Sequence, residues 1–331
     1  MHKRSPKLLL SLLVAFVFVG IGGPAAADSG GVERFATLPK PGPGFPEGIA
    51  ADQAGRIYVS TFDFSTDNVI HVFGRNGHLQ TTISLPGVVP LGLEFDRAGN
   101  LYVANFGGGT VLKFTPPFNS GSLPAQTFAV CGGAGAGCGL NAITFDAAGD
   151  LYVSDSFGGG VFKLDLPSGA VSTFVADDLL KPGSHGFPPF GANGLAFDAA
   201  GKNLYIANTA DDRILKYDLA AGTLSAFAES INGADGIAFD RHGRLWVAAN
   251  QGDEVVALNS KGRVVERLGS FQGVGKDGAA KGLLFPASIV ISRGSIYVTN
   301  LGLALTGAAG DEPEEDVSTY TVSRVRLDHG D

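Results

Sequence analysis

The chain contains six copies of one short segment, and this repetition limits the possible folds more than any other feature of the sequence. The copies approximate the pattern x-G-[IL]-x-[FA]-D-x-x-G-x-[LI]-[YW]-[VI], and the last copy is degenerate. They begin at Glu47, Leu91, Asn141, Asn193, Asp235 and Ala287, at intervals of 42 to 52 residues. A repeat of this length with several strands in each unit is typical of a β-propeller. We therefore predict an all-β, six-bladed propeller.

Each repeat divides into four strands, and the fourth repeat shows them as GLAFD, NLYIAN, RILKYDL and TLSAFA. The Asp and Gly of D-x-x-G predict a tight turn between the first two strands. We interpret the five aspartates of this motif as turn formers and not as ligands: Asp52, Asp96, Asp146, Asp198 and Asp240. The last repeat lacks a fourth strand, and VERFATL near the N-terminus resembles the fourth strands of other repeats. We expect residues 32–38 to complete blade 6, which closes the ring and hides both sheet edges.

The first 27 residues have the features of a cleaved signal peptide. A basic head precedes an apolar run from Leu8 to about Val19, and Ala25, Ala26 and Ala27 supply the small residues of a cleavage site. The run is too short to span a bilayer, so no membrane anchor is expected after cleavage. We predict a secreted or periplasmic protein with one domain over residues 28–331.

Charge and cysteine content narrow the classes of partner and compartment. Without residues 1–27, 21 basic residues remain against 32 acidic ones, a net charge of about −11. Such an acidic surface disfavours nucleic acid as a partner, and we expect a monomer that acts on a small molecule. The two cysteines, Cys131 and Cys138, are expected to form a disulfide in an oxidising compartment.

In a propeller the first strand of each blade lines the axis, so the first positions of the repeats should meet there. Four of the six are oxygen ligands: Glu47, Asn141, Asn193 and Asp235. Buried polar groups are costly without a partner, and an all-oxygen set with two carboxylates suits Ca²⁺, or less well another divalent cation. The alternative is a hydrogen-bonded polar cluster with ordered water.

Two further groups of residues lie on the same predicted face. A second polar set ends the second strands, and it serves either the site or strand termination: Asn105, Asp155, Asn208, Asn250 and Asn300. His185, in a loop before Asn193, is a candidate proton shuttle or substrate contact, with a solvated loop histidine as the alternative.

At these residues the sequence resembles the senescence-marker-protein/gluconolactonase family, also called regucalcin-like. The resemblance spans about residues 44–302 and rests on FPEG around Glu47, NGLAFD at Asn193 and DGIAFDRHGRLWVA at Asp235, which look like the calcium-ligand motifs of that family. Asn141 falls where the family has an Asn beside metal and substrate. The resemblance implies calcium-dependent hydrolysis of a lactone or related ester, with Asp235 as the base and Glu47 as the alternative base.

The departures from the family concern the substrate. Sugar-lactone enzymes carry an Arg where Gly139 stands, and diisopropyl fluorophosphatase has an Asp where Ala238 stands. Phe118, Phe187 and Phe190 in the loops suggest a substrate with an apolar part. The main alternative function is a non-catalytic binding propeller, as in NHL-type repeats, with structural calcium or none. A streptogramin-type lyase is disfavoured, because its catalytic His residues should come from the last blade and no His occurs between His242 and His329.

Overall fold

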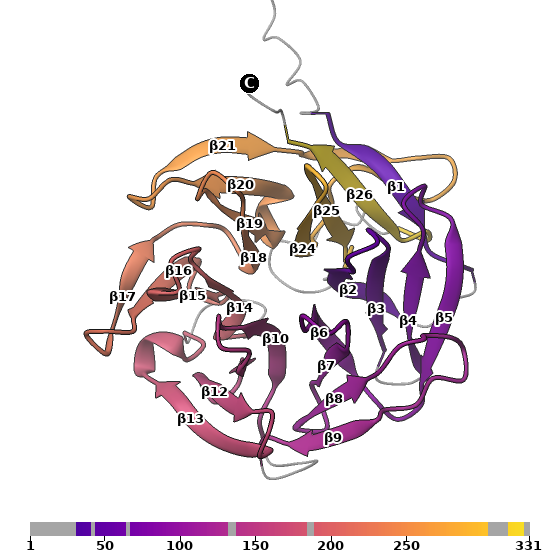
Figure 1. The fold of residues 1–331 in the computed structure, drawn as a ribbon. Helices are drawn as coiled ribbons and strands as arrows, with labels where there is room; N and C mark the ends of the chain where they lie inside the picture. Colours follow the sequence, from indigo (N-terminus) through magenta and orange to yellow (C-terminus); the bar gives the residue numbers. More distant parts are fainter. Residues whose placement is uncertain are drawn as a thin grey trace, which may run out of the picture.

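The computed structural model describes residues 31–40, 44–63, 67–131, 137–183, 189–303 and 317–327. These residues form six four-stranded antiparallel blades around one axis, which confirms the predicted six-bladed propeller (Figure 1). In blades 1 to 5 the strands follow sequence order, and the first strand of each is the innermost. In the part of the chain that the structure describes, no helix is long and apolar enough to cross a membrane.

The strands of the first three blades have short, regular lengths. Blade 1 contains β2 (Phe45–Ala51), β3 (Ile57–Phe62), β4 (Asn68–Phe73) and β5 (Leu79–Leu85). Blade 2 contains β6 (Pro90–Phe95), β7 (Leu101–Asn105), β8 (Thr110–Phe114) and β9 (Gln126–Ala129). Blade 3 contains β10 (Leu140–Phe145), β11 (Leu151–Asp155), β12 (Gly160–Asp165) and β13 (Ala170–Ala176).

The other three blades repeat this plan. Blade 4 contains β14 (Ala192–Phe197), β15 (Asn203–Asn208), β16 (Arg213–Asp218) and β17 (Thr223–Ala228). Blade 5 contains β18 (Ala234–Phe239), β19 (Leu245–Ala249), β20 (Glu254–Leu258) and β21 (Val264–Leu268). Blade 6 contains β24 (Pro286–Ser292), β25 (Ser295–Asn300), β26 (Thr321–Arg326) and β1 (Glu33–Thr37). Outside the blades, the described residues also form two 3₁₀ turns and one hairpin: η1 (Asp178–Leu180), η2 (Asn250–Gly252), β22 (Phe271–Val274) and β23 (Ala280–Gly282).

The N-terminal strand closes the ring as predicted. β1 pairs antiparallel with β26, from Glu33 opposite Arg324 to Thr37 opposite Thr321. An ion pair of 2.7 Å between Glu33 and Arg324 spans the same two strands. Closure of this kind gives blade 6 its fourth strand and removes the open sheet edge that would otherwise invite pairing with other chains.

The D-x-x-G aspartates form the predicted turns and also serve the core. Asp52 Oδ1 accepts the backbone N–H of Arg56 at 2.9 Å, which holds the turn between β2 and β3. The other oxygen of such an aspartate accepts a hydrogen bond from the O–H or N–H group of the buried Tyr or Trp in the second strand. This bond recurs as Tyr58 to Asp52, Tyr102 to Asp96, Tyr152 to Asp146 and Trp246 to Asp240. Because a buried Tyr or Trp needs a partner for its polar tip, one carboxylate stabilises both turn and core.

Aromatic pairs join neighbouring blades. The tyrosine of one second strand packs edge-to-face against the phenylalanine that ends the next inner strand. The ring centroids are 4.9 to 5.3 Å apart in Tyr58–Phe95, Tyr102–Phe145, Tyr152–Phe197 and Tyr205–Phe239. Pairs of this geometry stabilise the fold by about 0.5–1.5 kcal/mol each beyond the contribution of the apolar area that they bury.

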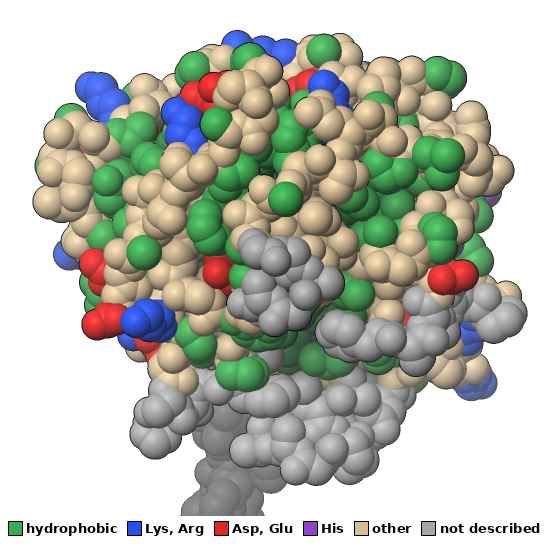
Figure 2. Space-filling model, turned by 90° about the horizontal axis from the view of Figure 1, so that it is seen from below, with side chains coloured by type: hydrophobic (Ala, Val, Ile, Leu, Met, Phe, Trp, Pro, Cys, Tyr) green, Lys and Arg blue, Asp and Glu red, His purple; other side chains and the backbone are tan. Residues whose placement is uncertain are grey.

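Seen from its edge, the molecule shows acidic and basic side chains interspersed among hydrophobic ones (Figure 2).

Glycine at the second repeat position allows the inner strands to approach one another closely. A Cβ atom on Gly92 would lie 2.3 Å from the Asn141 carbonyl oxygen, and one on Gly194 would lie 2.2 Å from the Asp235 carbonyl oxygen. Such contacts are shorter than any real Cβ contact. The glycine therefore lets the backbone of one first position rest against the neighbouring blade.

Candidate metal centre

The first two positions of every repeat lie in a β-bulge. In each blade the pairing of the two innermost strands is interrupted at these positions. In blade 1, Pro46 pairs with Thr61 and Ile49 with Val59, so the two residues between Pro46 and Ile49 face Ser60 alone. A bulge redirects a side chain out of the regular strand alternation. The first repeat positions are therefore set apart from the apolar residues that follow them.

The bulges bring the four predicted ligands into one buried layer around the axis. The inner strands contact one another in ring order, and β24 contacts β2 to complete the circle. All four side chains are buried: Glu47 is 5% exposed, Asn141 3%, Asn193 2% and Asp235 5%. The first positions of blades 2 and 6 are apolar and equally buried, as Leu91 and Ala287. Because the inner strands follow one another around the ring, Glu47 lies between the two apolar positions, and Asn141, Asn193 and Asp235 form a continuous run across the axis from it.

Hydroxyl groups fix the orientation of the two asparagine amides. Asn141 Nδ2 donates to Ser156 Oγ at 3.2 Å, and Ser156 Oγ donates to the Ala192 carbonyl at 2.8 Å. Asn193 Nδ2 donates to Thr209 Oγ1 at 2.9 Å, and Thr209 Oγ1 donates to the Ala234 carbonyl at 2.8 Å. Because each amide nitrogen is held by a hydroxyl, the amide oxygen is the end left for a cation.

Asp235 receives a hydrogen bond from a residue whose role the sequence left open. Asn250 Nδ2 donates to Asp235 Oδ2 at 3.1 Å, and Asn250 is fully buried. A Cβ atom on Gly233 would lie 1.8 Å from Asn250 Oδ1, and Gly233 has a φ of +64°. Only glycine fits there, so the connection between blades 4 and 5 is shaped around the Asn250 side chain.

Burial makes the ionised forms of the two carboxylates in the layer, Glu47 and Asp235, energetically unfavourable. Burial, and after it the charge of Asp235, raises the pKa of Glu47 well above its ordinary 4.5. Burial raises the pKa of Asp235 from 3.8 to about 7, although hydrogen bonds from Asn250 and Asn193 oppose the shift. Burial thus disfavours the ionised form of both acids, and neither has a positively charged partner among the described residues.

The unpartnered oxygens identify what kind of partner would fit. Three of them are buried and have no hydrogen-bond partner in the described structure: Glu47 Oε2, Asp235 Oδ1 and Asn250 Oδ1. Within the described residues, no cluster of three or more His, Cys, Asp or Glu could hold a metal. The axial set instead combines two carboxylates with asparagine amides. An oxygen-only set of this kind fits Ca²⁺, which takes six to eight oxygen ligands and accepts water among them.

Most of the second polar set has a structural role. Asn105 Oδ1 accepts the backbone N–H of Val89, and Asp155 Oδ1 accepts that of Gly139. Asn208 donates to the carbonyls of Leu179 and Lys181, and Asn300 accepts the N–H of Leu284. These residues hold the connections between blades. Asn250 differs, because its amide binds the side chain of Asp235. Nothing in its sequence position separates it from the others.

Other sequence-based expectations have mixed outcomes. His185, Phe187 and the predicted signal segment lie outside the described residues. The sequence analysis placed Phe118 in a loop near the substrate, and this prediction is wrong, because Phe118 does not lie near the axial layer. It packs against Tyr58 and Phe95 and lines a pocket of about 440 Å³ beside the D-x-x-G turns of blades 1 and 2, on the opposite face.

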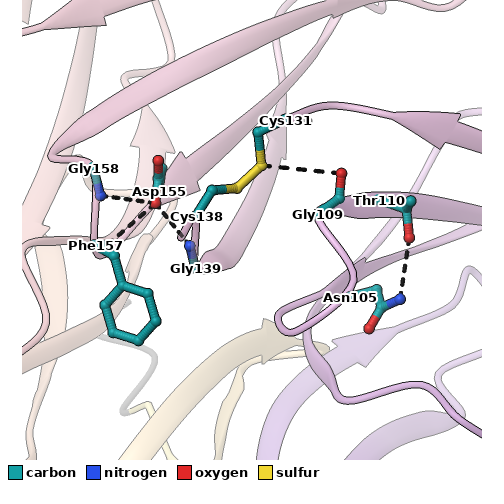
Figure 3. Close-up of a disulfide and its surroundings, with 9 residues drawn as sticks. All are labelled: Asn105, Gly109, Thr110, Cys131, Cys138, Gly139, Asp155, Phe157 and Gly158. Atoms are coloured by element: carbon teal, nitrogen blue, oxygen red, sulfur yellow. Dashed lines mark hydrogen bonds between the residues drawn. A yellow bond between two sulfur atoms is a disulfide. The ribbon is translucent and has the colours of Figure 1, made fainter. Parts of the chain in front are cut away.

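The cysteine prediction is confirmed. Cys131 and Cys138 form a disulfide in the connection between blades 2 and 3, one residue before Gly139 (Figure 3). The bond closes a short loop next to the strand that carries Asn141.

Fold and site together define a six-bladed propeller with a layer of buried carboxylate and amide side chains at its axis. Residues 126–270 match the model of the SMP-30/Gluconolactonase/LRE-like region, and this match confirms the family resemblance identified from the sequence motifs. The matched segment contains Asn141, Asn193 and Asp235. No curated protein matches the sequence.

Solved structures of similar fold cover nearly the whole chain. A luciferin-regenerating enzyme has a TM-score of 0.65 at 17% identity and covers 90% of this chain and 95% of its own. A gluconolactonase from Xanthomonas campestris has a TM-score of 0.63 at 13% identity, with 90% and 89% covered. A calcium-binding protein, regucalcin, from Agrobacterium tumefaciens has a TM-score of 0.59 at 15% identity, with 89% and 96% covered. At such identities the similarity establishes the fold alone.

Proposed function

We propose that the protein is an exported calcium-dependent hydrolase of lactones or related carboxylic esters. Glu47, Asn141, Asn193 and Asp235 would hold the ion. The observation that carries this proposal is the pair of buried carboxylates with unpartnered oxygens, Glu47 Oε2 and Asp235 Oδ1. A buried carboxylate without a partner is strongly unfavourable, and a divalent cation between the two would offset both charges. The family match, to a model whose description includes gluconolactonases, supports the hydrolase class.

In the proposed hydrolysis, the residues of the layer would have separate roles as metal ligands, as the base and as the group that orients the base. Calcium, when bound, supplies a Lewis acid that polarises a substrate carbonyl. Asp235 is the candidate base, with Glu47 as the alternative. The base would accept a proton from the attacking water and return it to the leaving oxygen. Water then adds across the acyl C–O bond, and a lactone yields one hydroxy acid. Asn250 orients Asp235 by binding one of its two oxygens.

Export rests on the N-terminal segment and on the disulfide. Residues 1–27 have the charge and apolar pattern of a cleaved signal, and Cys131–Cys138 suits the oxidising environment of the periplasm or the medium. Mass spectrometry of the mature protein would locate the N-terminus near Asp28, and an intact residue 1 in the exported fraction would contradict this proposal.

Calorimetric titration of calcium into chelator-treated protein tests the site. Wild type should bind one ion with a dissociation constant of about 10⁻⁶ to 10⁻³ M. Glu47→Gln and Asp235→Asn remove one charge each with little change of shape and should abolish binding. Asp178→Asn is a matched control, since the Asp178 side chain is 92% exposed and lies in η1. Binding that neither axial variant changes would exclude the proposed metal centre.

Turnover separates the hydrolase from the binding module. A panel of lactones and esters should be hydrolysed with calcium, and both chelation and Asp235→Asn should abolish the activity while the fold is retained. Calcium binding without turnover of any member of the panel would favour the non-catalytic propeller with structural calcium.

A further inference from the structure

Three phenylalanines from three consecutive blades form an aromatic cluster beside the axial layer. The centroids of Phe106 and Phe157 are 5.0 Å apart, and both rings lie 5.8 Å from Phe190. Phe106 is buried, at 6% exposure, whereas Phe157 is 44% exposed. Among the described residues, Phe157 is the one aromatic with so large an exposed fraction. An exposed aromatic ring that rests on a buried one offers a ready surface for an apolar ligand.

The cluster lies directly next to the asparagines of the axial layer. Phe157 follows Ser156, whose hydroxyl holds the amide of Asn141. Phe190 precedes Gly191, and Gly191 N donates to the Ser156 carbonyl oxygen at 2.8 Å. Asn193 is two residues further on. The rings therefore stand on the half of the layer that carries Asn141 and Asn193.

The rings of Phe106 and Phe157 leave no room for a side chain at position 139. A Cβ atom on Gly139 would lie 2.8 Å from a ring atom of Phe106 and 2.9 Å from one of Phe157. The two rings thus fill the space of a side chain two residues before Asn141. Any donor or charge from position 139 is excluded.

The Asp155 carboxylate lies beside the cluster, and one of its oxygens is held by three backbone N–H groups. Asp155 Oδ1 accepts the backbone N–H groups of Gly139, Phe157 and Gly158 at 2.8, 3.1 and 3.0 Å (Figure 3). These bonds hold the loop that carries Phe157 against the chain that leads to Asn141. The surface next to the asparagines is therefore rigidly placed and apolar, and it would bind hydrocarbon better than hydroxyl groups, which would lose their hydrogen bonds to water there.

We propose that Phe106, Phe157 and Phe190 bind an apolar alkyl or aryl part of the substrate and so select hydrophobic esters or lactones over polyhydroxylated ones. This inference rests on the proposed hydrolase function. The transfer of one methylene from water to an apolar surface favours binding by a factor of about four. Activity should therefore rise with chain length until the aromatic surface is covered.

A chain-length series tests this specificity. The ratio of kcat/KM for alkyl γ-lactones of increasing chain length should rise about two- to fourfold per methylene for the wild type with calcium. In Phe157→Ala the increment should fall toward unity, and Phe157→Leu should restore part of it. Leu123→Ala is the control, because Leu123 is 78% exposed in the connection between β8 and β9. An unchanged increment in Phe157→Ala, or a preference for a polyhydroxylated lactone, would overturn the proposal.

A binding measurement keeps the two proposals apart. Alkyl lactams of the same chain lengths resist hydrolysis and can be titrated calorimetrically whether or not the protein is catalytic. If the wild type hydrolyses nothing but binds the longer lactams, with Phe157→Ala binding at least tenfold more weakly, the aromatic site stands and the hydrolase function fails. If the wild type binds none of them, the aromatic site is refuted even where esters are cleaved.

Discussion

One buried aspartate, Asp235, lies at the start of β18, and another, Asp240, directly follows its last residue; their surroundings are opposite. Asp240 accepts hydrogen bonds from the backbone N–H groups of His242 and Arg244, from the Arg244 side chain at 2.6 Å and from Trp246 Nε1 at 3.0 Å. Burial would raise its pKa, but these donors together hold the pKa below its ordinary value. At the other end, Asp235 keeps one oxygen without a partner, and its pKa rises to about 7.

The difference teaches how to distinguish a structural carboxylate from one placed for a ligand. The donors around Asp240 come from its own turn and from the next strand, so they form whenever the blade forms. Asp235 receives only asparagine amides, which are too few to compensate for its burial. A carboxylate that the fold buries and leaves incompletely bonded is a candidate for function.

The largest expected effect is a dependence of metal-free stability on pH. In acid, Asp235 is protonated in both the folded and the unfolded state and costs nothing. Between about pH 4 and pH 7 the unfolded chain releases this proton while the folded protein keeps it, so stability falls as pH rises. The shift of the pKa from 3.8 to about 7 corresponds to about 4 kcal/mol, and Glu47 adds to it in the same direction.

Urea unfolding of the chelator-treated protein from pH 4 to pH 8 measures this loss. Other groups titrate over the same range, so the comparison is with the double variant Glu47→Gln, Asp235→Asn, which should lack the decline. Saturating calcium should restore the wild type most strongly above pH 7. Parallel stability curves for wild type and double variant would contradict the interpretation of the layer.

The next largest effect separates the two aspartates by mutation. Asp240→Ala should destabilise the protein by about 3 kcal/mol, because it leaves Trp246 Nε1 and the Arg244 side chain without their buried partner. The loss should be the same with and without calcium. Asp235→Asn should not destabilise the metal-free protein at pH 7. Thermal unfolding of both variants, with chelator and with calcium, checks the contrast, and a calcium-dependent loss in Asp240→Ala would break it.

A smaller effect is expected from the residue that orients Asp235. Asn250→Ala removes the hydrogen bond to Asp235 Oδ2 and should weaken calcium binding about tenfold, the lower end of effects seen for residues that orient metal ligands. Asn105→Ala is the matched control, because Asn105 ends the second strand of blade 2 but binds the backbone of Val89. Calorimetry should show a changed dissociation constant for the first variant alone. Equal losses in both would assign Asn250 a structural role only.

The smallest effect concerns the hydroxyl that fixes the Asn193 amide. Thr209→Val keeps the shape but removes the bond to Asn193 Nδ2, and calcium binding should weaken about threefold, equivalent to one ordinary hydrogen bond. Thr209→Ser should retain wild-type affinity, since it restores the hydroxyl. A loss in both variants would mean that packing of the Thr209 methyl group matters and not the orientation of the amide.

Local chemistry determined what could be read from the sequence. The D-x-x-G turn, the alternation of the strands and the likeness of VERFATL to other fourth strands are properties of short segments, so they predicted the blades and the pairing of β1 with β26. The first repeat positions likewise follow from the period of the repeat, which placed Glu47, Asn141, Asn193 and Asp235 on one ring. The placement of Phe118 was wrong, because the apolar character of a loop does not say which face the loop occupies.

Only the tertiary structure decided which polar residues remain without a partner. Asn105, Asp155, Asn208, Asn250 and Asn300 occupy the same position in five blades, yet four bind backbone groups of the connections and Asn250 alone binds Asp235. The bulges at the axis, and the rings that fill the space beside Gly139, depend in the same way on contacts between blades. By itself the sequence determined the blades, their closure and the residue types at the axis. Whether a buried oxygen accepts a hydrogen bond depends on donor groups from neighbouring blades and connections. These groups come close to it only when the ring has folded.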